Sequence, residues 1–153
     1  KKFKSITNWN YITCDLNSPL ADIKADICKL PFKNFEFDLI ICNHVLEHID
    51  NDFKAMEEIY RVLKKNGIGI LQVPIDESLS ITFEDKTIID PKIKSELFGQ
   101  YDHVRKYGKD FYDRLKSVGF KVKKIDVQKN LSEKEIKEYS LPKYEKIPFV
   151  IKS

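Results

Sequence analysis

The sequence predicts an α/β fold in which a mostly parallel β-sheet is flanked by helices. Apolar segments rich in β-branched and aromatic residues recur along the chain, and residues 39–42 are apolar without interruption. Such a run is typical of a parallel strand that is covered on both faces. Between these segments, Phe53, Met56, Tyr60 and Leu63 recur at steps of three and four residues, which indicates one face of a helix. Alternation of strands and helices favours helices packed on a parallel sheet.

Three strands are expected in the first half of the chain. They cover residues 9–16, 35–42 and 68–73. Their ends are expected near Asp15, Cys42 and Val73, and Pro74 stops the third strand because proline cannot donate to a ladder. We expect the second and third strands to be parallel neighbours, since a crossover helix joins them.

That crossover helix is predicted over residues 50–65. Asp50 or Asp52 is expected to cap its start, because a side-chain carboxylate accepts from the unpaired backbone N–H groups of a first turn. Asn66 and Gly67 are expected to end it.

A polar stretch over residues 75–106 follows, and connections of that length are often functional. Beyond it, the spacing of Phe111, Leu115 and Val118 predicts a helix that Gly119 ends.

The C-terminal part predicts an antiparallel strand pair at the sheet edge, formed by residues 120–127 and 147–151. A short charged helix capped by Ser132 joins the two strands. The alternation of apolar residues slips between Val122 and Ile125, which predicts a β-bulge.

The composition fits a single domain over residues 1–153. The net charge of +3 comes from 27 basic and 24 acidic residues spread along the chain, which argues against a nucleic-acid partner, because that needs a clustered basic face. No apolar run approaches the roughly 20 residues of a membrane span, so no membrane partner is expected.

The three cysteines fit no zinc or disulfide pattern, and the histidines and acids show no zinc spacing. We therefore expect no metal and a cytoplasmic location; nothing in the sequence indicates an oligomeric state.

Ligands of open α/β sheets bind at the carboxyl ends of the strands, so the residues that follow each strand are the candidates for a site. Asp15 and Leu16 follow the first strand, Asn43 and His44 follow the second, and Asp76 lies just beyond the third.

Four segments of the sequence together resemble a class I S-adenosylmethionine-dependent methyltransferase. They are ADICKLPF, FDLIICNHVLEHI, EIYRVLKKNGIGILQVP, and GQYDHVRKYG followed by LKSVGFKV; the last is similar to one bacterial subgroup. Each segment alone is weak evidence for the family. The order and spacing of all four carry the resemblance, which covers nearly the whole chain. It implies a Rossmann-like, doubly wound fold, S-adenosylmethionine as the cofactor, and methyl transfer to a small-molecule or glycan-like acceptor.

The resemblance also implies positions for the cofactor. Asp15, followed by Leu16, matches the acid that accepts the ribose hydroxyls. Asp26 matches the acid that meets the adenine amino group, and the backbone N–H of Ile27 matches the donor to the ring, with residues 30–32 as an apolar wall. Asp15 as a strand-end turn residue and Asp26 as a loop acid remain open alternatives.

Asn43 and His44 match the segment beside the methionine part of the cofactor. A base is needed only if the acceptor carries its proton into the reaction, and histidine suits that task near neutral pH. His44 and His103 are the candidate catalytic residues. For Glu47 and His48, helix capping and a functional role are equally open interpretations.

Residues 99–108 (GQYDHVRKYG) are predicted to fold over the carboxyl edge of the sheet as a lid, with hinges at the two terminal glycines. Asp102, His103 and Arg105 would contact the acceptor. The rival interpretation is a surface loop held by an ion pair between Asp102 and Arg105.

The sequence departs from the family at its N-terminal side. The family's first strand and glycine-rich turn should precede the strand that ends at Asp15, and only ten residues stand before Tyr11. That strand normally lies mid-sheet, between the strands that end at Asp15 and Cys42. We therefore expect a domain that is incomplete at its N-terminus and lacks the first strand of the family fold.

Two other functions remain open. A non-catalytic methyltransferase-like module could bind a partner across the open site or the exposed sheet edge. An NAD-dependent dehydrogenase would also carry its glycine fingerprint upstream of the strand that ends at Asp15.

Overall fold

The computed structural model describes residue 6 and residues 8–141 and 146–153. Its strands are β1 (Cys14–Asp15), β2 (Ile23–Lys24), β3 (Phe37–Ile41), β4 (Leu63–Ile70), β5 (Phe83–Glu84), β6 (Arg105–Lys106), β7 (Phe120–Ile125) and β8 (Ile147–Lys152). Its helices are α1 (Asp52–Val62), α2 (Pro91–Phe98), α3 (Phe111–Ser117) and α4 (Glu133–Glu138), with short 3-10 turns η2 (Leu46–His48) and η3 (Val127–Asn130).

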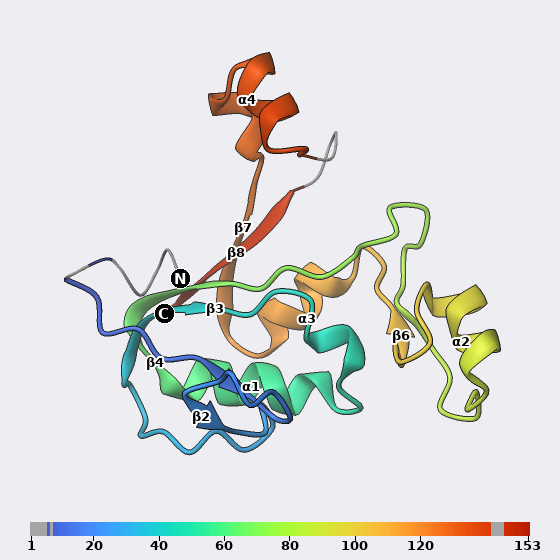
Figure 1. Ribbon diagram of the computed structural model, residues 1–153, viewed down its shortest axis with the longest axis horizontal. Helices are drawn as coiled ribbons and strands as arrows, with labels where there is room; N and C mark the ends of the chain where they lie inside the picture. The colour runs from blue at the N-terminus through green and yellow to red at the C-terminus, as the bar shows by residue number, and fades with distance from the viewer. Residues whose placement is uncertain (1–5, 7, 142–145) are drawn as a thin grey trace.

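The central sheet has the order β3-β4-β8-β7 (Figure 1). β3 and β4 are parallel neighbours, and β8 runs antiparallel to both β4 and β7. This confirms the predicted α/β fold, its parallel pair and its antiparallel C-terminal pair. β8 is inserted between β4 and β7, so of the predicted C-terminal pair only β7 lies at an edge of the sheet. The parallel share of the described sheet is smaller than we expected.

β1 and β2 form a separate parallel pair (Figure 1). The strand predicted over residues 9–16 is therefore reduced to two residues. The Asp22 carboxylate braces this pair, because it accepts from both the backbone N–H and the hydroxyl of Thr13, at 2.9 and 2.7 Å. β1 nevertheless ends at Asp15, as predicted.

The start and the end of α1 differ from the prediction. Asn51 caps its start by accepting from the backbone N–H of Lys54 at 3.0 Å, so neither Asp50 nor Asp52 is the cap. The helix ends at Val62, because Leu63 takes an extended conformation with ψ 139°.

β4 consequently begins at Leu63, inside the segment expected to be helical. Its register with β3 shifts after the Phe37–Leu63 pair. Asn66 has a φ of +62° in the intervening segment. The turn signal Asn66-Gly67 is thus used for an irregularity within a strand rather than for a helix end, and β4 ends at Ile70, short of Val73.

The long connection over residues 75–106 is structured. It contains α2 and the antiparallel β5–β6 pair. In Figure 1, α2 and β6 lie to the right, the side toward which the chain leaves β3 and β4. The connection therefore stands beyond the carboxyl ends of the parallel strands.

The C-terminal elements agree with the sequence in two respects and differ in one. α3 is followed by Gly119 at φ +112°, and Ser132 caps α4 in a reciprocal capping box with Glu135. The pairing of β7 with β8 is continuous from Phe120 to Ile125, so the predicted bulge is wrong.

The core lies between α1, β4 and the C-terminal elements. Its fully buried side chains include Met56, Ile59, Leu71, Phe111 and Leu115. Burial raises the pKa of the neighbouring Cys42 to about 12, so this cysteine stays an inert thiol. Among the described residues, no helix is long and apolar enough to cross a membrane.

Candidate functional site

Polar residues gather where β3 ends. His44 stands two residues past the Cys42 position, and its backbone N–H donates to Gln72 O at 2.8 Å. Its φ of +54° is in the left-handed region, which costs a non-glycine residue about 1–2 kcal/mol. This bend starts the turn η2.

The imidazole of His44 meets Glu47, with 3.2 Å between its Nδ1 and Glu47 Oε1. The Glu47 side chain is 2% exposed, and its second oxygen, Oε2, is buried without a hydrogen-bond partner. A buried carboxylate oxygen without a partner is costly, so Glu47 is an unusual element of this site.

His103 comes from the long connection and is 8% exposed. Its Nδ1 lies 3.0 Å from Phe98 O. A carbonyl oxygen only accepts hydrogen bonds, so Nδ1 carries a proton and the neutral ring keeps its lone pair on Nε2. His103 therefore has a nitrogen that can accept a proton or bind a cation, as a catalytic base requires.

His48 packs edge-on against His103, with 4.6 Å between ring centroids. Its Nδ1 lies 3.3 Å from Asp102 Oδ2, which favours the proton on Nδ1. Glu47, His48 and His103 each offer a ligand atom, and these atoms lie within 4.8 Å of one another. The lid segment thus meets η2 through side chains that carry chemistry.

A cleft of about 380 Å³ opens beside this group. It is lined by Glu47, Pro74, Ile75, Asp76, Phe98, Gly99, His103, Arg105 and Lys106. These residues come from η2, from the chain after β4 and from the long connection, so the cleft lies at the carboxyl edge where a ligand of an α/β sheet is expected.

Asp76 lines the cleft as a fixed charge. Lys106 Nζ lies 2.8 Å from Asp76 Oδ2, and Ser78 donates to Oδ1. The hydrogen bond from Lys106, aided by those from Ser78, holds the pKa of the Asp76 carboxyl well below its usual range. Asp76 is therefore a weak base, and the histidines remain the better candidates for proton transfer.

The lid segment is anchored by Arg105, which is 2% exposed. Its guanidinium donates to Leu46 O and Asp50 O, both at 3.0 Å, and to Ile49 O. Asp102 pairs with His48 instead, so the ion pair between Asp102 and Arg105 in the rival interpretation is wrong. Arg105 thus has a structural role, and its contact with an acceptor stays a prediction.

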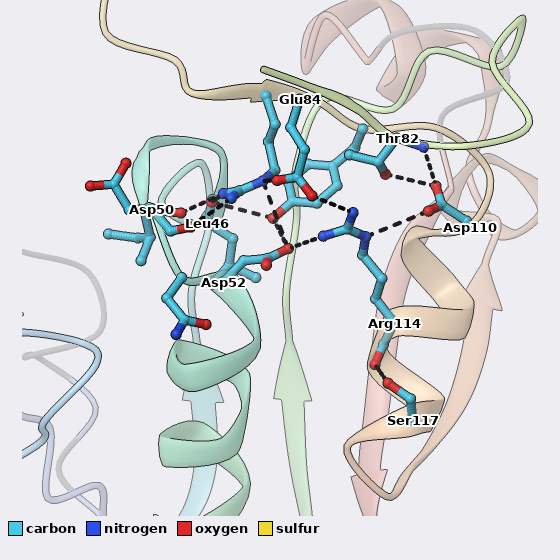
Figure 2. A network of polar contacts seen from close by, with 12 residues as sticks. Leu46, Asp50, Asp52, Thr82, Glu84, Asp110, Arg114 and Ser117 are labelled. Carbon is cyan, nitrogen blue, oxygen red and sulfur yellow. Dashed lines mark hydrogen bonds and ion pairs between the residues drawn. The ribbon is translucent and has the colours of Figure 1, made fainter. Parts of the chain in front are cut away.

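A second arginine extends this anchor (Figure 2). Arg114 donates to Asp52 Oδ2 and to Glu84 Oε1, both at 2.9 Å, and Figure 2 shows these three side chains converging. Tyr107 is fully buried and also donates to Asp52, at 2.9 Å. The network joins the start of α1, β5 and α3. The segment over residues 99–108 is therefore packed against the rest of the domain, and its anchoring side chains are buried.

The predicted cofactor residues stand at the other strand ends. Asp15 is exposed, and its Oδ1 accepts from the backbone N–H groups of Asn17 and Ser18 at 2.8 and 2.7 Å. These bonds, that from Ser18 foremost, lower the pKa of Asp15, so its carboxylate is ionised and faces solvent. The exposed Leu16 follows it.

Asp26 and Ile27 follow β2. Asp26 Oδ1 accepts from the backbone N–H of Cys28 at 2.8 Å, and Ile27 packs partly against the core. Residues 30–32 are held by Arg61, which donates to Leu30 O at 3.0 Å and to Phe32 O at 2.8 Å. Asp15, Asp26 and Asn43 therefore follow three different strands. The carboxylates of Asp15 and Asp26 make local contacts that support their loops.

Residues 7–71 match the family model described as a methyltransferase domain. Two uncharacterized proteins of Methanocaldococcus jannaschii are similar to the chain, at 40% identity over 79 residues and 38% over 105 residues. The matches cover 52% and 65% of this chain, but only 29% and 47% of those relatives. The chain thus spans less than half the length of either archaeal relative.

Solved structures share the fold of this chain. One is the 1,6-didemethyltoxoflavin-N1-methyltransferase of Burkholderia thailandensis, with a TM-score of 0.56 and 12% identity over 92% of this chain and 60% of that chain. Another is the cyclase SpnF, with a TM-score of 0.51 and 15% identity over 83% of this chain and 53% of that chain. At these identities the likeness concerns the fold alone.

Glu47 and His48 were left undecided between capping and function in the sequence, and the structure places both in the polar group. A signal was present: His44, Glu47 and His48 have the histidine-x-x-glutamate-histidine spacing that some zinc hydrolases place on an α-helix. Here Glu47 and His48 lie within the short turn η2, and His44 lies two residues before it. His103, which completes the group with Glu47 and His48, lies 55 residues beyond His48.

Proposed function

We propose that the whole protein is an S-adenosylmethionine-dependent methyltransferase that acts on a small-molecule or glycan-like acceptor. The observation that carries this proposal is the match of residues 7–71 to a methyltransferase domain, combined with a cleft at the carboxyl edge of the sheet whose lining includes ionisable side chains. The family supplies the reaction class, and the cleft supplies a place for the acceptor beside the strand ends.

The strand-end residues fit the cofactor. Asp15 is an ionised, exposed carboxylate whose Oδ1 is held by two backbone donors, so its Oδ2 suits the ribose hydroxyls. Asp26 and the backbone of Ile27 would hold the adenine, with Leu16 alongside, and Asn43 and His44 would flank the methionine part. Bound S-adenosylmethionine supplies an electrophilic methyl group on a sulfonium.

The residues of the chain then have two tasks. The packed segment over residues 99–108 closes one side of the cleft and orients the acceptor, because alignment lowers much of the barrier of an in-line displacement. His103, with its lone pair on Nε2, or the exposed His44 would take the acceptor proton where the acceptor carries one.

A non-catalytic binding module is the second candidate, and one observation favours it. β3 ends the described sheet and is paired only with β4 among the described strands. An open strand edge is a template for pairing with another chain.

One assay separates the two candidates. The full-length protein is incubated with S-adenosylmethionine labelled in its methyl group and with a panel of hydroxyl- and amine-bearing small molecules and oligosaccharides. Formation of labelled product and S-adenosylhomocysteine is the expected result. Cofactor binding that never leads to transfer across the panel would favour the binding module, and absence of cofactor binding would contradict both the enzyme and its cofactor site.

A further inference from the structure

We propose that Glu47, His48 and His103 bind one divalent transition-metal ion of the Zn²⁺ type at the inner side of the cleft. Two imidazoles and one carboxylate form a donor set that zinc uses in catalytic sites, where a fourth position stays open. The potential ligand atoms lie within 4.8 Å of one another.

In both histidines, the contact made by Nδ1 leaves the other ring nitrogen available to bind an ion. Phe98 O holds the Nδ1 proton of His103 at 3.0 Å, and the Asp102 carboxylate lies 3.3 Å from Nδ1 of His48. A histidine that ligates a metal usually donates its other nitrogen to a carbonyl or carboxylate in this way. Nε2 of each ring is therefore the atom left to coordinate.

Glu47 supplies the independent observation. Its Oε1 meets His44 Nδ1 at 3.2 Å, whereas Oε2 is buried without a hydrogen-bond partner. A carboxylate in this position leaves a lone pair unsatisfied away from water. A cation between Oε2 and the two rings would satisfy this lone pair. Packing of the two histidines alone would leave it unsatisfied.

The geometry requires little movement. Tetrahedral ligands about 2.1 Å from zinc lie about 3.4 Å apart, so the farthest pair would approach by at most about 1.4 Å from the 4.8 Å limit. The histidines are carried by different segments, and side-chain rotation supplies that movement.

The open position faces the cleft, because Glu47 and His103 both line it. Water or an oxygen of the acceptor would fill that position. The role of the acceptor oxygen rests on the proposed function. With the ion bound, His103 holds the metal instead of taking a proton, and His44 is the remaining base.

Metal binding is tested without any activity measurement. The full-length protein, freed of metal by a chelator, is titrated with Zn²⁺ by calorimetry, and its Co²⁺ complex is recorded by visible absorption, which separates nitrogen and oxygen ligands from thiolates. We expect one ion per chain, a Co²⁺ spectrum without a thiolate band, and a higher unfolding temperature with Zn²⁺.

Variants identify the ligands. His48→Gln, His103→Gln and Glu47→Gln should each weaken Zn²⁺ binding at least tenfold, and the pair of histidine substitutions should abolish the thermal shift. Glu57→Gln is the matched control for Glu47→Gln, because it removes an exposed carboxylate of α1 that pairs with Lys54 outside the group; it should keep one bound ion. Thermal unfolding without metal verifies that each variant folds.

Two results would overturn the proposal. One is the absence of stoichiometric Zn²⁺ or Co²⁺ binding by the folded wild-type protein. The other is binding that survives the double histidine substitution, or that falls equally in the Glu57→Gln control. Failure of methyl transfer with intact metal binding would count against the proposed function alone.

Discussion

The guanidinium of Arg105 donates a hydrogen bond of 3.0 Å to the carbonyl oxygen of Leu46. This contact joins the long connection after β4 to the turn after β3, across 59 positions of sequence. Both ends of the bond are buried. The candidate site is therefore built by two segments that one arginine holds together.

Replacing Arg105 should destabilise the protein strongly. Arg105→Ala removes one donor from each of three carbonyl oxygens and from Glu84 Oε2. Losing one partner of a buried ionic network costs about 3–5 kcal/mol, measured as the free energy of unfolding in urea. Lys64→Ala is the control, because its exposed pair with Asp38 is worth at most about 1 kcal/mol. Equal losses in the two variants would show that Arg105 is not the anchor.

The glycines of the lid segment should respond differently to substitution. A Cβ at Gly108 would lie 2.8 Å from the backbone carbon of Ile81, so Gly108→Ala should lower the free energy of unfolding by about 1–3 kcal/mol through overpacking. Gly99 has open space and a φ of +95°, so Gly99→Asn should cost less than about 1 kcal/mol, because asparagine tolerates this helix cap. A larger loss for Gly99→Asn would contradict the packing described for Gly108.

The acid stability of the domain should depend on Glu58. Arg61 donates to its carboxylate at 2.8 Å, as does the backbone N–H of Leu30. The hydrogen bond from Arg61 is the main cause of a lowered pKa for Glu58 relative to 4.5.

A lowered folded-state pKa stabilises the protein above the unfolded-state value, and this stabilisation is lost as the pH falls through the folded-state pKa. Glu58→Gln should thus cost about 1.5–3 kcal/mol at pH 7, and the difference from wild type should shrink below about pH 4. Urea unfolding across this pH range measures it. A difference that stays constant with pH would show that the charge of Glu58 is not responsible.

The sequence predicted the elements whose signals are local. The apolar run of β3, the glycine after α3 and the capping box of Ser132 all act within a few residues, and each was found as expected. The end of α1 was missed, because Leu63 continues the helical spacing and yet pairs with Phe37 of β3. That contact is made by a neighbouring strand and overrides the helical period.

The candidate site was predicted by position and not by role. Arg105 was expected to contact the acceptor, but Glu84 approaches from a distant segment and accepts from its guanidinium. Tyr107 of the same segment is likewise buried and donates to the distant Asp52. The same cause hid the cluster of Glu47, His48 and His103. Spacing within one segment carries no information on a side chain that returns from another segment.

His103 should matter for turnover more than for the cofactor. In the full-length enzyme, His103→Ala should lower the rate of methyl transfer at least tenfold while leaving the affinity for S-adenosylmethionine nearly unchanged. The substitution removes the base of the metal-free site, and general base catalysis contributes about 10²–10⁴; with an ion bound, it removes a ligand of that ion. Steady-state kinetics and calorimetry on the same preparation measure both. Equal losses of turnover and cofactor affinity would mean that the segment braces the cofactor pocket instead of serving the acceptor.

Calorimetric titration of S-adenosylmethionine into the full-length protein and its Asp15→Ala variant tests the central claim, a cofactor site at the strand ends. We predict stoichiometric binding by the wild type and a loss of about 1–3 kcal/mol in the variant, the usual cost of losing a charged hydrogen-bond partner. Asp38→Ala is the matched control, since its carboxylate is also exposed and pairs only with Lys64 in the contacts described here; its affinity should equal that of the wild type. Unchanged affinity in Asp15→Ala, or no binding by the wild type, would contradict the account.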